Sequence, residues 1–377
     1  MSCLLFASAK QKDPTMKKIK SLLLILLLWC FMPKQLTAQD TIACTNCGCD
    51  HDRPDFHAPI GVMIDHIHEP RQWMVSYRYM GMYMNGNLRG SERISQNDIY
   101  QNYIMSSDRM NMQMHMLMAM YGLSRKITLM GMLNYVNNSM NMSMMMYGMM
   151  DMSTMSMMDM SDTKMTATSR TSGFGDTKLY ILYSLYKGDN HQLLLSGGLS
   201  LPTGNISLSG TNMMGERQRY PYCMQLGTGS YSVLPGLTYT GQSNIFSWGL
   251  QVTGDVKTNY NKAGYKLGNE FIATGWIAHN WNKWISNSIR VNSDALGKIN
   301  GYDPLIALYR TTETDADVTN TGAYRTSAFA GVNILIPKGF LEGNRIGLEV
   351  GIPVYQYVNG IQMNTKAYIN AGWQYAF

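Results

Sequence analysis

The stretch Met363-Asn-Thr-Lys-Ala-Tyr-Ile-Asn-Ala-Gly-Trp-Gln-Tyr-Ala-Phe377 alternates between an apolar file and a polar or small file, and it ends on an aromatic residue. Successive side chains of a β-strand point to opposite faces, so one face suits lipid or a core and the other suits water. A terminal strand ending Trp-x-Tyr-x-Phe is typical of the closing strand of an outer-membrane barrel, with its ring side chains at the membrane interface. The stretch predicts an all-β fold, a transmembrane antiparallel β-barrel.

The N-terminal residues are those expected of an exported protein. Met16 to Lys20 form a positive n-region, Leu22 to Met32 form an apolar run of signal-peptide length, and small residues precede Gln39. We therefore expect a signal peptide over 1–38, in which translation starts downstream of Met1. A Cys/His-rich periplasmic segment over 39–70 and the barrel over 71–377 should follow it. Removing residues 1–38 lowers the formal charge from +6 to +1, which leaves no basic patch for nucleic acid.

Alternating runs separated by turns predict about 12 strands, within a range of roughly 10–14. These strands are expected near residues 72–84, 109–122, 127–137, 174–187, 191–202, 228–240, 245–256, 267–280, 284–293, 323–336, 345–356 and 363–377. Short turns alternate with longer loops along this order, as in barrels of a Gram-negative-type outer membrane. We therefore expect periplasmic turns and termini, and outer loops of which the longest, over 138–173, is rich in methionine.

One charge sets the register of the first strand. Arg78 would cost roughly 2–4 kcal/mol if it faced lipid at the bilayer midplane, so it should face the lumen together with Met80 and Met82. The same argument of alternation places Met130 and Met132 in the lumen. On the second strand, five methionines from 112 to 120 share one face, while Gln113 and His115 occupy the other. Their polarity favours the lumen for Gln113 and His115, so the five methionines on the opposite face are expected to point towards lipid.

The methionine content is the one extreme feature of the composition. Of 34 methionines, 22 lie between Met105 and Met165, and 13 lie in the segment Met140 to Met165. The thioether is a soft, uncharged ligand that suits Cu(I) and, by the same reasoning, Ag(I). The spacing brings several sulfurs within reach of one ion, and the candidate ligands are Met140, Met142, Met144, Met155 and Met157. A low-complexity surface loop, or one whose sulfurs scavenge oxidants, explains the pattern equally well.

A second cluster follows the expected cleavage site and combines three cysteines with four histidines. The candidate ligands are Cys44, Cys47, Cys49, His51, His57, His66 and His68. Thiolate with imidazole is a ligand set for Zn²⁺ or copper. The structural alternative in an oxidising periplasm is one disulfide and one leftover thiol, which could itself pair with Cys223. The sequence leaves both interpretations open.

Several short motifs together resemble a known family. They are His57-Ala-Pro-Ile-Gly-Val-Met63, Asp65-His66, the Tyr-Arg-Tyr-Met run ending at Met80, Gly173-Phe-Gly-Asp176, Leu201-Pro-Thr-Gly204, Tyr222-Cys-Met-Gln-Leu226 and Leu234-Pro-Gly236. In this combination the chain resembles transporter-like outer-membrane barrels of the phenol-degradation-pathway channel type, over residues 57–377. More narrowly, it is similar to the methionine-rich branch associated with heavy-metal (copper) efflux systems. The resemblance implies a barrel, copper handling and a metal efflux system as partner.

Two function classes follow. The first is a barrel in the outer-membrane lipid that passes or captures small solutes, linked to soft metal ions such as copper and silver. The second is a general small-solute channel, or a structural or adhesive surface barrel, without a metal role. No grouping of nucleophile, base and acid emerges, so we expect no enzyme and no catalytic residues. No organic cofactor is expected either, the candidate bound species being Cu(I), Ag(I) or Zn²⁺.

Overall fold

The computed structural model describes residues 53–146, 163–212 and 215–377. The expected signal peptide and the candidate ligands Cys44, Cys47, Cys49, His51, Met155 and Met157 lie outside the described residues. The described residues all belong to one compact unit.

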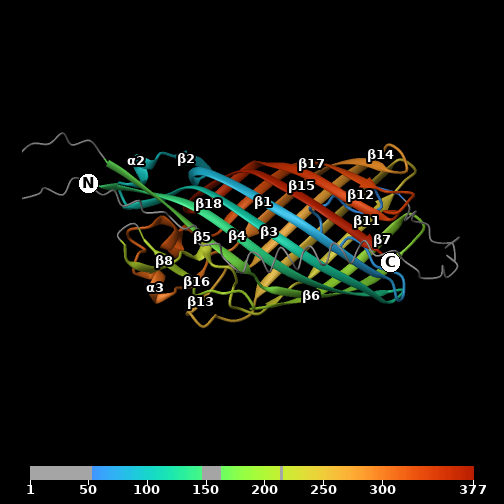
Figure 1. Cartoon of the computed structure of the whole chain (residues 1–377), viewed down its shortest axis with the longest axis horizontal. Helices are drawn as coiled ribbons and strands as arrows, with labels where there is room; N and C mark the ends of the chain where they lie inside the picture. Colours follow the sequence, from blue (N-terminus) through green and yellow to red (C-terminus); the bar gives the residue numbers. More distant parts are fainter. Residues whose placement is uncertain (1–52, 147–162, 213–214) are drawn as a thin grey trace, which may run out of the picture. The chain divides into compact units, whose positions relative to one another are not determined.

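Antiparallel strands form a closed ring (Figure 1). Each strand pairs with its neighbours in chain order, and the pairs β12–β14 and β18–β1 complete the circle. The eleven wall elements are β1 (Trp73–Gly90), β3 (Met105–Ser124), β4 (Ile127–Met146), β6 (Thr177–Lys187), β7 (His191–Leu201), β11 (Gly236–Gln242), β12 (Phe246–Lys257), β14 (Glu270–Asn280), β15 (Ile285–Leu296), β17 (Ala323–Leu335) and β18 (Asn344–Ala376). The fold expected from the sequence, an all-β antiparallel barrel, is confirmed.

Element β18 is a hairpin of two wall strands. Its first part pairs with β17 and its last part pairs with β1. Arg345 Nη1 donates to Gln374 Oε1 at 2.5 Å, and Asn370 Nδ2 donates to Glu349 Oε2 at 2.8 Å, which brings the two parts side by side. The reversal occurs at Gly360, whose φ of 62° is available to glycine at little cost. Counted this way, the ring has the twelve strands that the alternation predicts.

The strand sequences alternate because the wall separates two environments. Ile289 is 59% exposed on the outer face, whereas its neighbours Ser288 and Arg290 are 3% and 4% exposed and point inwards. An outer face of Leu, Ile, Val and aromatic side chains with a more polar interior is the pattern of a barrel in lipid. None of the helices in the described ranges is long and apolar enough to cross a membrane.

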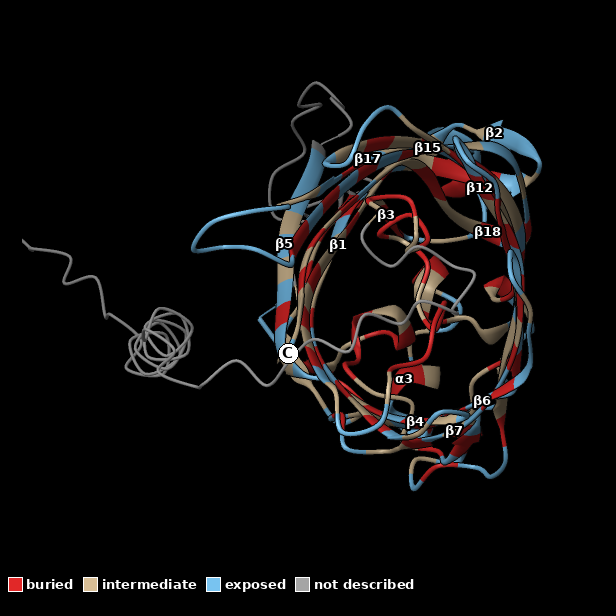
Figure 2. Ribbon diagram, turned by 90° about the vertical axis from the view of Figure 1, so that its right-hand side faces the viewer, coloured by how far each residue is buried: buried red, intermediate tan, exposed pale blue. Residues whose placement is uncertain are grey.

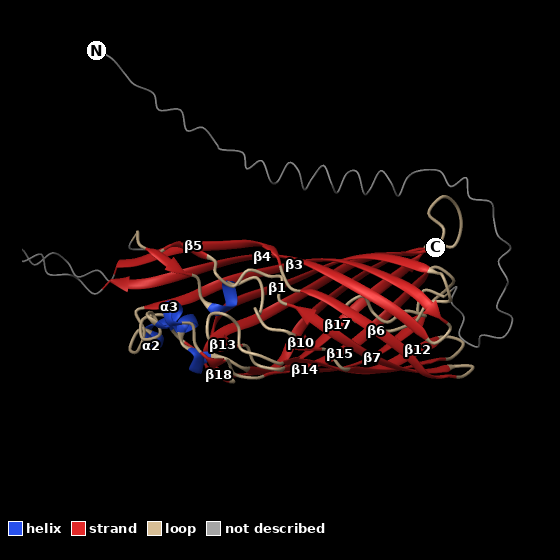
Figure 3. Cartoon of the chain, turned by 90° about the horizontal axis from the view of Figure 1, so that it is seen from below, coloured by secondary structure: helices blue, strands red, loops and turns tan. Residues whose placement is uncertain are grey.

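The remaining elements are short and belong mostly to the long loops. They are β2 (Glu92–Ile94), α2 (Gln96–Ile99), β5 (Thr163–Phe174), β8 (Ser209–Thr211), β9 (Arg217–Arg219), η1 (Tyr222–Met224), β10 (Ser232–Val233), β13 (Tyr265–Lys266), β16 (Asn300–Gly301), α3 (Pro304–Ala307), η2 (Thr314–Ala316) and η3 (Val318–Asn320). The labelled helices lie together at one end of the barrel, here called the loop end (Figure 3). The opposite end carries the short turns, such as 188–190 and 281–284, and is called the turn end.

The expected boundaries of the methionine-rich loop, 138–173, are wrong. Strand β4 continues to Met146, and β5 begins at Thr163 and pairs with β4. Residues 138–144 pair with β3 on one side and with β5 on the other, so their backbone groups are satisfied as strand. The composition of this stretch, Met with Ser and Asn, is that of a solvated loop. Its methionines nevertheless recur with period 2, which places them on one face of a paired strand.

Segments of the chain outside the wall strands fill the interior of the ring. Figure 2 shows segments inside the wall, among them helix α3, of which Ile306 is buried. Residues 53–72, here called the plug, lie inside the barrel at its turn end before the chain enters β1. The backbone N–H of His68 donates to Thr128 Oγ1 of β4 at 2.9 Å, and Arg53 Nη1 donates to the carbonyl of Ser243 at 2.6 Å. The plug and the folded loops therefore occupy opposite halves of the lumen.

Candidate functional site: a methionine-lined lumen and its plug

Three adjacent wall strands, β1, β3 and β4, line one sector of the lumen with methionine. Even-numbered residues of all three strands point inwards, and we call the methionines among them the methionine track. Its members are Met74, Met80, Met82, Met84, Met110, Met112, Met114, Met116, Met118, Met120, Met130, Met132, Met140, Met142 and Met144. The interior opposite this sector is polar, with side chains such as Thr274, Ser288 and Asn333 buried there.

The register places three methionines in one row at each end of the track. Near the turn end, Met74, Met120 and Met130 are direct neighbours across β1, β3 and β4. Near the loop end, the corresponding row is Met84, Met110 and Met140. Directly opposite residues have Cβ atoms roughly 4.5–5.5 Å apart, so flexible thioethers in one row can converge on one ion. All six side chains are at most 8% exposed.

This arrangement corrects the expected orientation of β3. Met116, Met118 and Met120 are only 2–3% exposed and face the lumen rather than lipid. His115 faces outwards and makes a 2.7 Å hydrogen bond with the hydroxyl of Tyr77. The expectation failed because it assumed a watery lumen. Plug and loops exclude water from the methionine sector, so apolar side chains are stable there.

The loop-end row belongs to a larger buried group, the loop-end cluster. Its buried members are Met84, Met105, Met110, Met140, Met142, Met144 and Met224. Cys223 packs against the cluster as a free thiol. Burial raises the pKa of the Cys223 thiol well above its usual value, with nearby Asp315 adding to the effect. The sulfur is therefore protonated at neutral pH and behaves as a neutral neighbour of the thioethers.

Two cavities adjoin the lumen, one of about 20 Å³ in the turn-end half and one of about 70 Å³ in the loop-end half. The larger one, about 70 Å³, is lined by Met105 and Met142 of the loop-end cluster together with Gln218 and Glu313. Gln218 Nε2 donates to Glu313 Oε1 at 2.8 Å. Burial nevertheless raises the pKa of Glu313 to about 7, with Asp315 contributing. A titratable carboxyl thus borders the space next to the buried sulfurs.

Wall side chains hold the plug by its backbone carbonyls. Arg78 is 4% exposed and its Nη1 donates to two of them. The contacts are Arg78 to Ile60 O (2.7 Å) and Val62 O (2.5 Å), Arg345 to Ala58 O (2.6 Å), Thr238 to Ile64 O (3.1 Å), and Gln251 to Met63 O (2.7 Å). Plug residues Ile64 and Ile67 pack against the turn-end half of the methionine track. The plug therefore covers that half.

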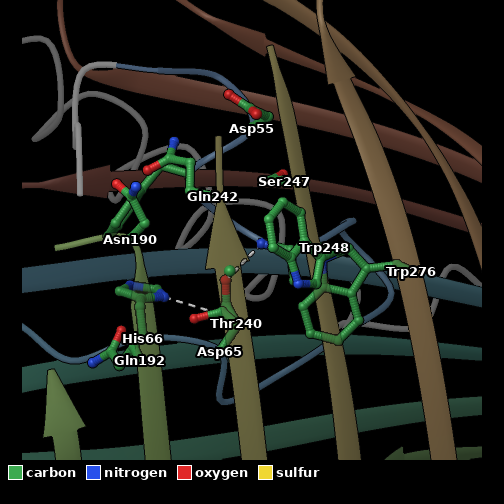
Figure 4. A pocket seen from close by; sticks show the side chains of 13 residues that line it. Asp55, Asp65, His66, Asn190, Gln192, Thr240, Gln242, Ser247, Trp248 and Trp276 are labelled. Atoms are coloured by element: carbon green, nitrogen blue, oxygen red, sulfur yellow. Dashed lines mark hydrogen bonds and ion pairs between the residues drawn. The ribbon is translucent and has the colours of Figure 1, made fainter. Parts of the chain in front are cut away.

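The plug itself gathers three of the histidines singled out in the sequence. His57 Nδ1 lies 3.2 Å from His66 Nδ1, and His66 Nε2 lies 3.2 Å from His68 Nε2. Asp65 Oδ1 lies 2.9 Å from His66 Nδ1 (Figure 4). Although burial alone raises the pKa of Asp65, His66 and His57 outweigh it and hold the pKa well below its usual value. Burial, with His66 beside it, lowers the pKa of His57 well below its usual value.

Apart from the plug histidines His57, His66 and His68, the candidate residues from the sequence fall into three groups. Met140, Met142 and Met144 lie in strand β4 rather than in a loop, and they meet in the loop-end cluster with Met105, Met110 and Met224, which sequence reasoning missed. Met80, Met82, Met130, Met132 and Arg78 point into the lumen. The even spacing of Met110 to Met120 was the available signal for Met110, whereas Met105 and Met224 lie outside that pattern. The cysteines and His51 lie outside the described residues, so their use in a metal site or a disulfide stays a prediction.

Comparisons with known proteins agree with the fold. A family model described as "Putative MetA-pathway of phenol degradation" matches residues 128–289. The structure is similar to that of an outer membrane channel from Pseudomonas putida F1, with a TM-score of 0.53 at 15% identity, over 83% of this chain and 98% of that chain. A FadL homologue from Pseudomonas aeruginosa aligns with a TM-score of only 0.39 at 9% identity, over 81% of this chain and 89% of that chain. No curated protein matches the sequence. The chain thus shares the fold of an outer-membrane channel.

Proposed function

We propose that this chain is an outer-membrane channel for small solutes whose methionine track binds and conducts soft metal ions, Cu(I) and Ag(I). The observation that carries the proposal is the pair of three-methionine rows on β1, β3 and β4. Thioether sulfur favours soft ions and stays uncharged, so a row binds a monovalent cation without competing protons. Zn²⁺ and Mg²⁺, which prefer nitrogen, thiolate or oxygen ligands, are not favoured in such a row.

The spacing of the track suits passage as well as capture. Conduction requires several sites that bind an ion strongly enough to admit it and weakly enough to release it. Between the two rows, Met82 lies opposite Met112, and Met80 lies opposite Met114, so methionine pairs continue along the wall. Each pair offers two sulfurs where a row offers three, so an ion should bind more weakly at these intermediate sites and move on.

Arg78 interrupts the track and gives the channel its closed state. It lies opposite Met116, between the two rows, and its charge opposes a cation there. The same guanidinium holds the plug through Ile60 and Val62. An ion that enters from the loop end, past the folded loops, reaches no further than Arg78 while the plug is docked, and onward passage requires the plug to move.

Equilibrium binding of Ag(I) to the refolded full-length barrel tests the proposal. We expect wild type to bind Ag(I) with a preference over Zn²⁺ at the track, and the triple variant Met84→Leu/Met110→Leu/Met140→Leu to bind at least about 10-fold more weakly. Leu117→Met is the matched control, because it adds a thioether to the outer face, where Leu117 is 41% exposed. Equal Ag(I) affinity in wild type and the triple variant would leave the alternative, a general small-solute channel without a metal role.

A further inference from the structure

The plug brings two histidines and one aspartate close together. We propose that His57, Asp65 and His66 bind one divalent transition-metal ion, Zn²⁺ or Cu²⁺, through two imidazole nitrogens and one carboxylate oxygen. The three residues are the group of potential metal ligands that the described part of the chain brings together. This site is separate from the methionine track, because it offers nitrogen and oxygen where the track offers sulfur.

Ligand atoms of the three residues lie close enough together to converge on one ion. His57 Nδ1 and His66 Nδ1 are 3.2 Å apart, Asp65 Oδ1 and His66 Nδ1 are 2.9 Å apart, and one ligand atom from each of the three residues lies within 4.8 Å of the other two. Zinc bonds to nitrogen and oxygen are about 2.0–2.2 Å, so two ligands of a tetrahedral ion lie roughly 3.3 Å from each other. Small movements of the three side chains would make all three bonds.

A relay of hydrogen bonds fixes the orientation of the His66 ring. Gln72 Oε1 accepts from the backbone N–H of Glu69 at 3.2 Å, so it is an oxygen that faces His68 Nδ1 at 3.1 Å. His68 Nδ1 donates to this oxygen, and His68 Nε2 lies 3.2 Å from His66 Nε2. The His66 ring is thereby held with its Nδ1 2.9 Å from Asp65 Oδ1, and a metal ion bound at this point would replace the proton between the two atoms.

Backbone support leaves one carboxylate oxygen for the ion. The backbone N–H of Ala58 donates to Asp65 Oδ2 at 2.8 Å, which orients the carboxylate so that Oδ1 faces His66. Supporting hydrogen bonds of this kind orient the ligands of most protein metal sites. Gln72 and His68 do the same for His66, so Asp65 and His66 are each held by a partner outside the ligand set before any ion arrives.

The surroundings provide a fourth coordination position. Asp65 and His66 line a cavity of about 20 Å³ at the turn end, with Trp248 and Trp276 forming part of its wall (Figure 4). This volume holds about one water molecule. Three protein ligands with one water is the ligand count of an open zinc site.

A bound ion would cross-link two parts of the plug, residue 57 and residues 65–66. His57 and His66 flank the segment whose carbonyls are held by Arg78 and Arg345. Because metal binding to a folded site adds its free energy to that folded form, the ion would favour the docked plug. Loss of the ion would favour plug release.

Cobalt titration of the full-length refolded barrel tests the site. We expect one equivalent of Co²⁺ with the absorption bands of a tetrahedral centre, displaced by Zn²⁺. The variant His57→Gln/Asp65→Asn/His66→Gln should lose this equivalent. Gln72→Leu changes a positioning residue outside the ligand set, and it should weaken Co²⁺ binding by about 10- to 100-fold while the barrel keeps its heat-modifiable migration.

Two further variants separate this site from others. His191→Gln removes an exposed histidine of β7 and should leave binding unchanged. The variant Cys44→Ser/Cys47→Ser/Cys49→Ser/His51→Ala should keep the equivalent of Co²⁺, since the three plug residues suffice. Retention of the Co²⁺ equivalent by the triple ligand variant would overturn the proposal, as would loss of binding in the cysteine variant. Failure of Ag(I) binding at the track would leave it intact.

Discussion

Met110 on β3 and Met140 on β4 lie directly opposite each other inside the barrel, and neither exposes any of its surface. With Met84 of β1 they form the loop-end row. Two roles are compatible with this burial, packing and metal ligation, and substitution separates them. Packing depends on volume, whereas ligation depends on sulfur.

Met110→Leu should therefore change stability little and Ag(I) affinity strongly. A volume-conserving exchange of Met for Leu usually costs less than about 1.5 kcal/mol, whereas Met110→Ala should cost roughly 2–5 kcal/mol through the cavity that it leaves. Both variants remove the same sulfur, so both should weaken Ag(I) binding equally. Denaturant unfolding and silver titration of the two variants are the measurements. Normal Ag(I) affinity in Met110→Leu would reduce the row to packing.

Arg78→Leu should open the barrel. The substitution removes the donor to two plug carbonyls, each worth roughly 1–3 kcal/mol when left unsatisfied, and it removes the charge between the two rows. We expect insertion to be retained and single-channel conductance in planar bilayers to rise, with faster proteolysis of residues 53–72. Arg170→Leu is the control, because Arg170 is exposed on β5. Unchanged conductance in Arg78→Leu would show that Arg78 does not hold the plug closed.

The loop end should loosen as the pH rises. Because burial raises the pKa of Glu313 from 4.5 to about 7, the folded loop favours the protonated carboxyl. The loop's docking free energy is therefore full below about pH 4.5 and falls as the pH rises to about 7, by on the order of 3 kcal/mol. Hydrogen exchange of residues 303–320, corrected for intrinsic rates, should accelerate between about pH 5 and 8.

Glu313→Gln should abolish this pH dependence, because the amide keeps an acceptor for Gln218 and has no charge to bury. Glu342→Gln, on an exposed turn, should keep the wild-type dependence. The same pH slope in Glu313→Gln as in wild type would assign the effect to another group.

The last residue should matter for assembly. Phe377 and Trp73 exchange both backbone hydrogen bonds, at 2.8 and 2.9 Å, where the closing strand meets the first strand. Deleting Phe377 removes this pair and an aromatic side chain that is 55% exposed at the turn end. We expect a smaller fraction of heat-modifiable folded barrel, and a normal fraction for Phe377→Tyr. Equal folding yields for the deletion and wild type would contradict this role.

Local alternation predicted much of the fold. The strands from Trp73 to Phe377 follow a period of 2, which the residues themselves display. The plug left no such signal, since residues 53–72 are held by contacts with residues far along the chain, such as Arg345. The inward methionines of β3 were assigned to lipid because hydrophobicity alone does not distinguish lipid from a dry lumen. The meeting of Asp65 with His57 likewise depends on a chain reversal that spacing does not encode.

X-ray absorption at the copper edge of the Cu(I)-loaded, refolded barrel identifies the atoms that bind the ion. The variant Cys44→Ser/Cys47→Ser/Cys49→Ser/Cys223→Ser is used, so that thiolates do not contribute sulfur. We expect a coordination shell of sulfur alone, which is lost in Met84→Leu/Met110→Leu/Met140→Leu. A shell of nitrogen and oxygen, or a sulfur shell unchanged in that variant, would contradict this expectation.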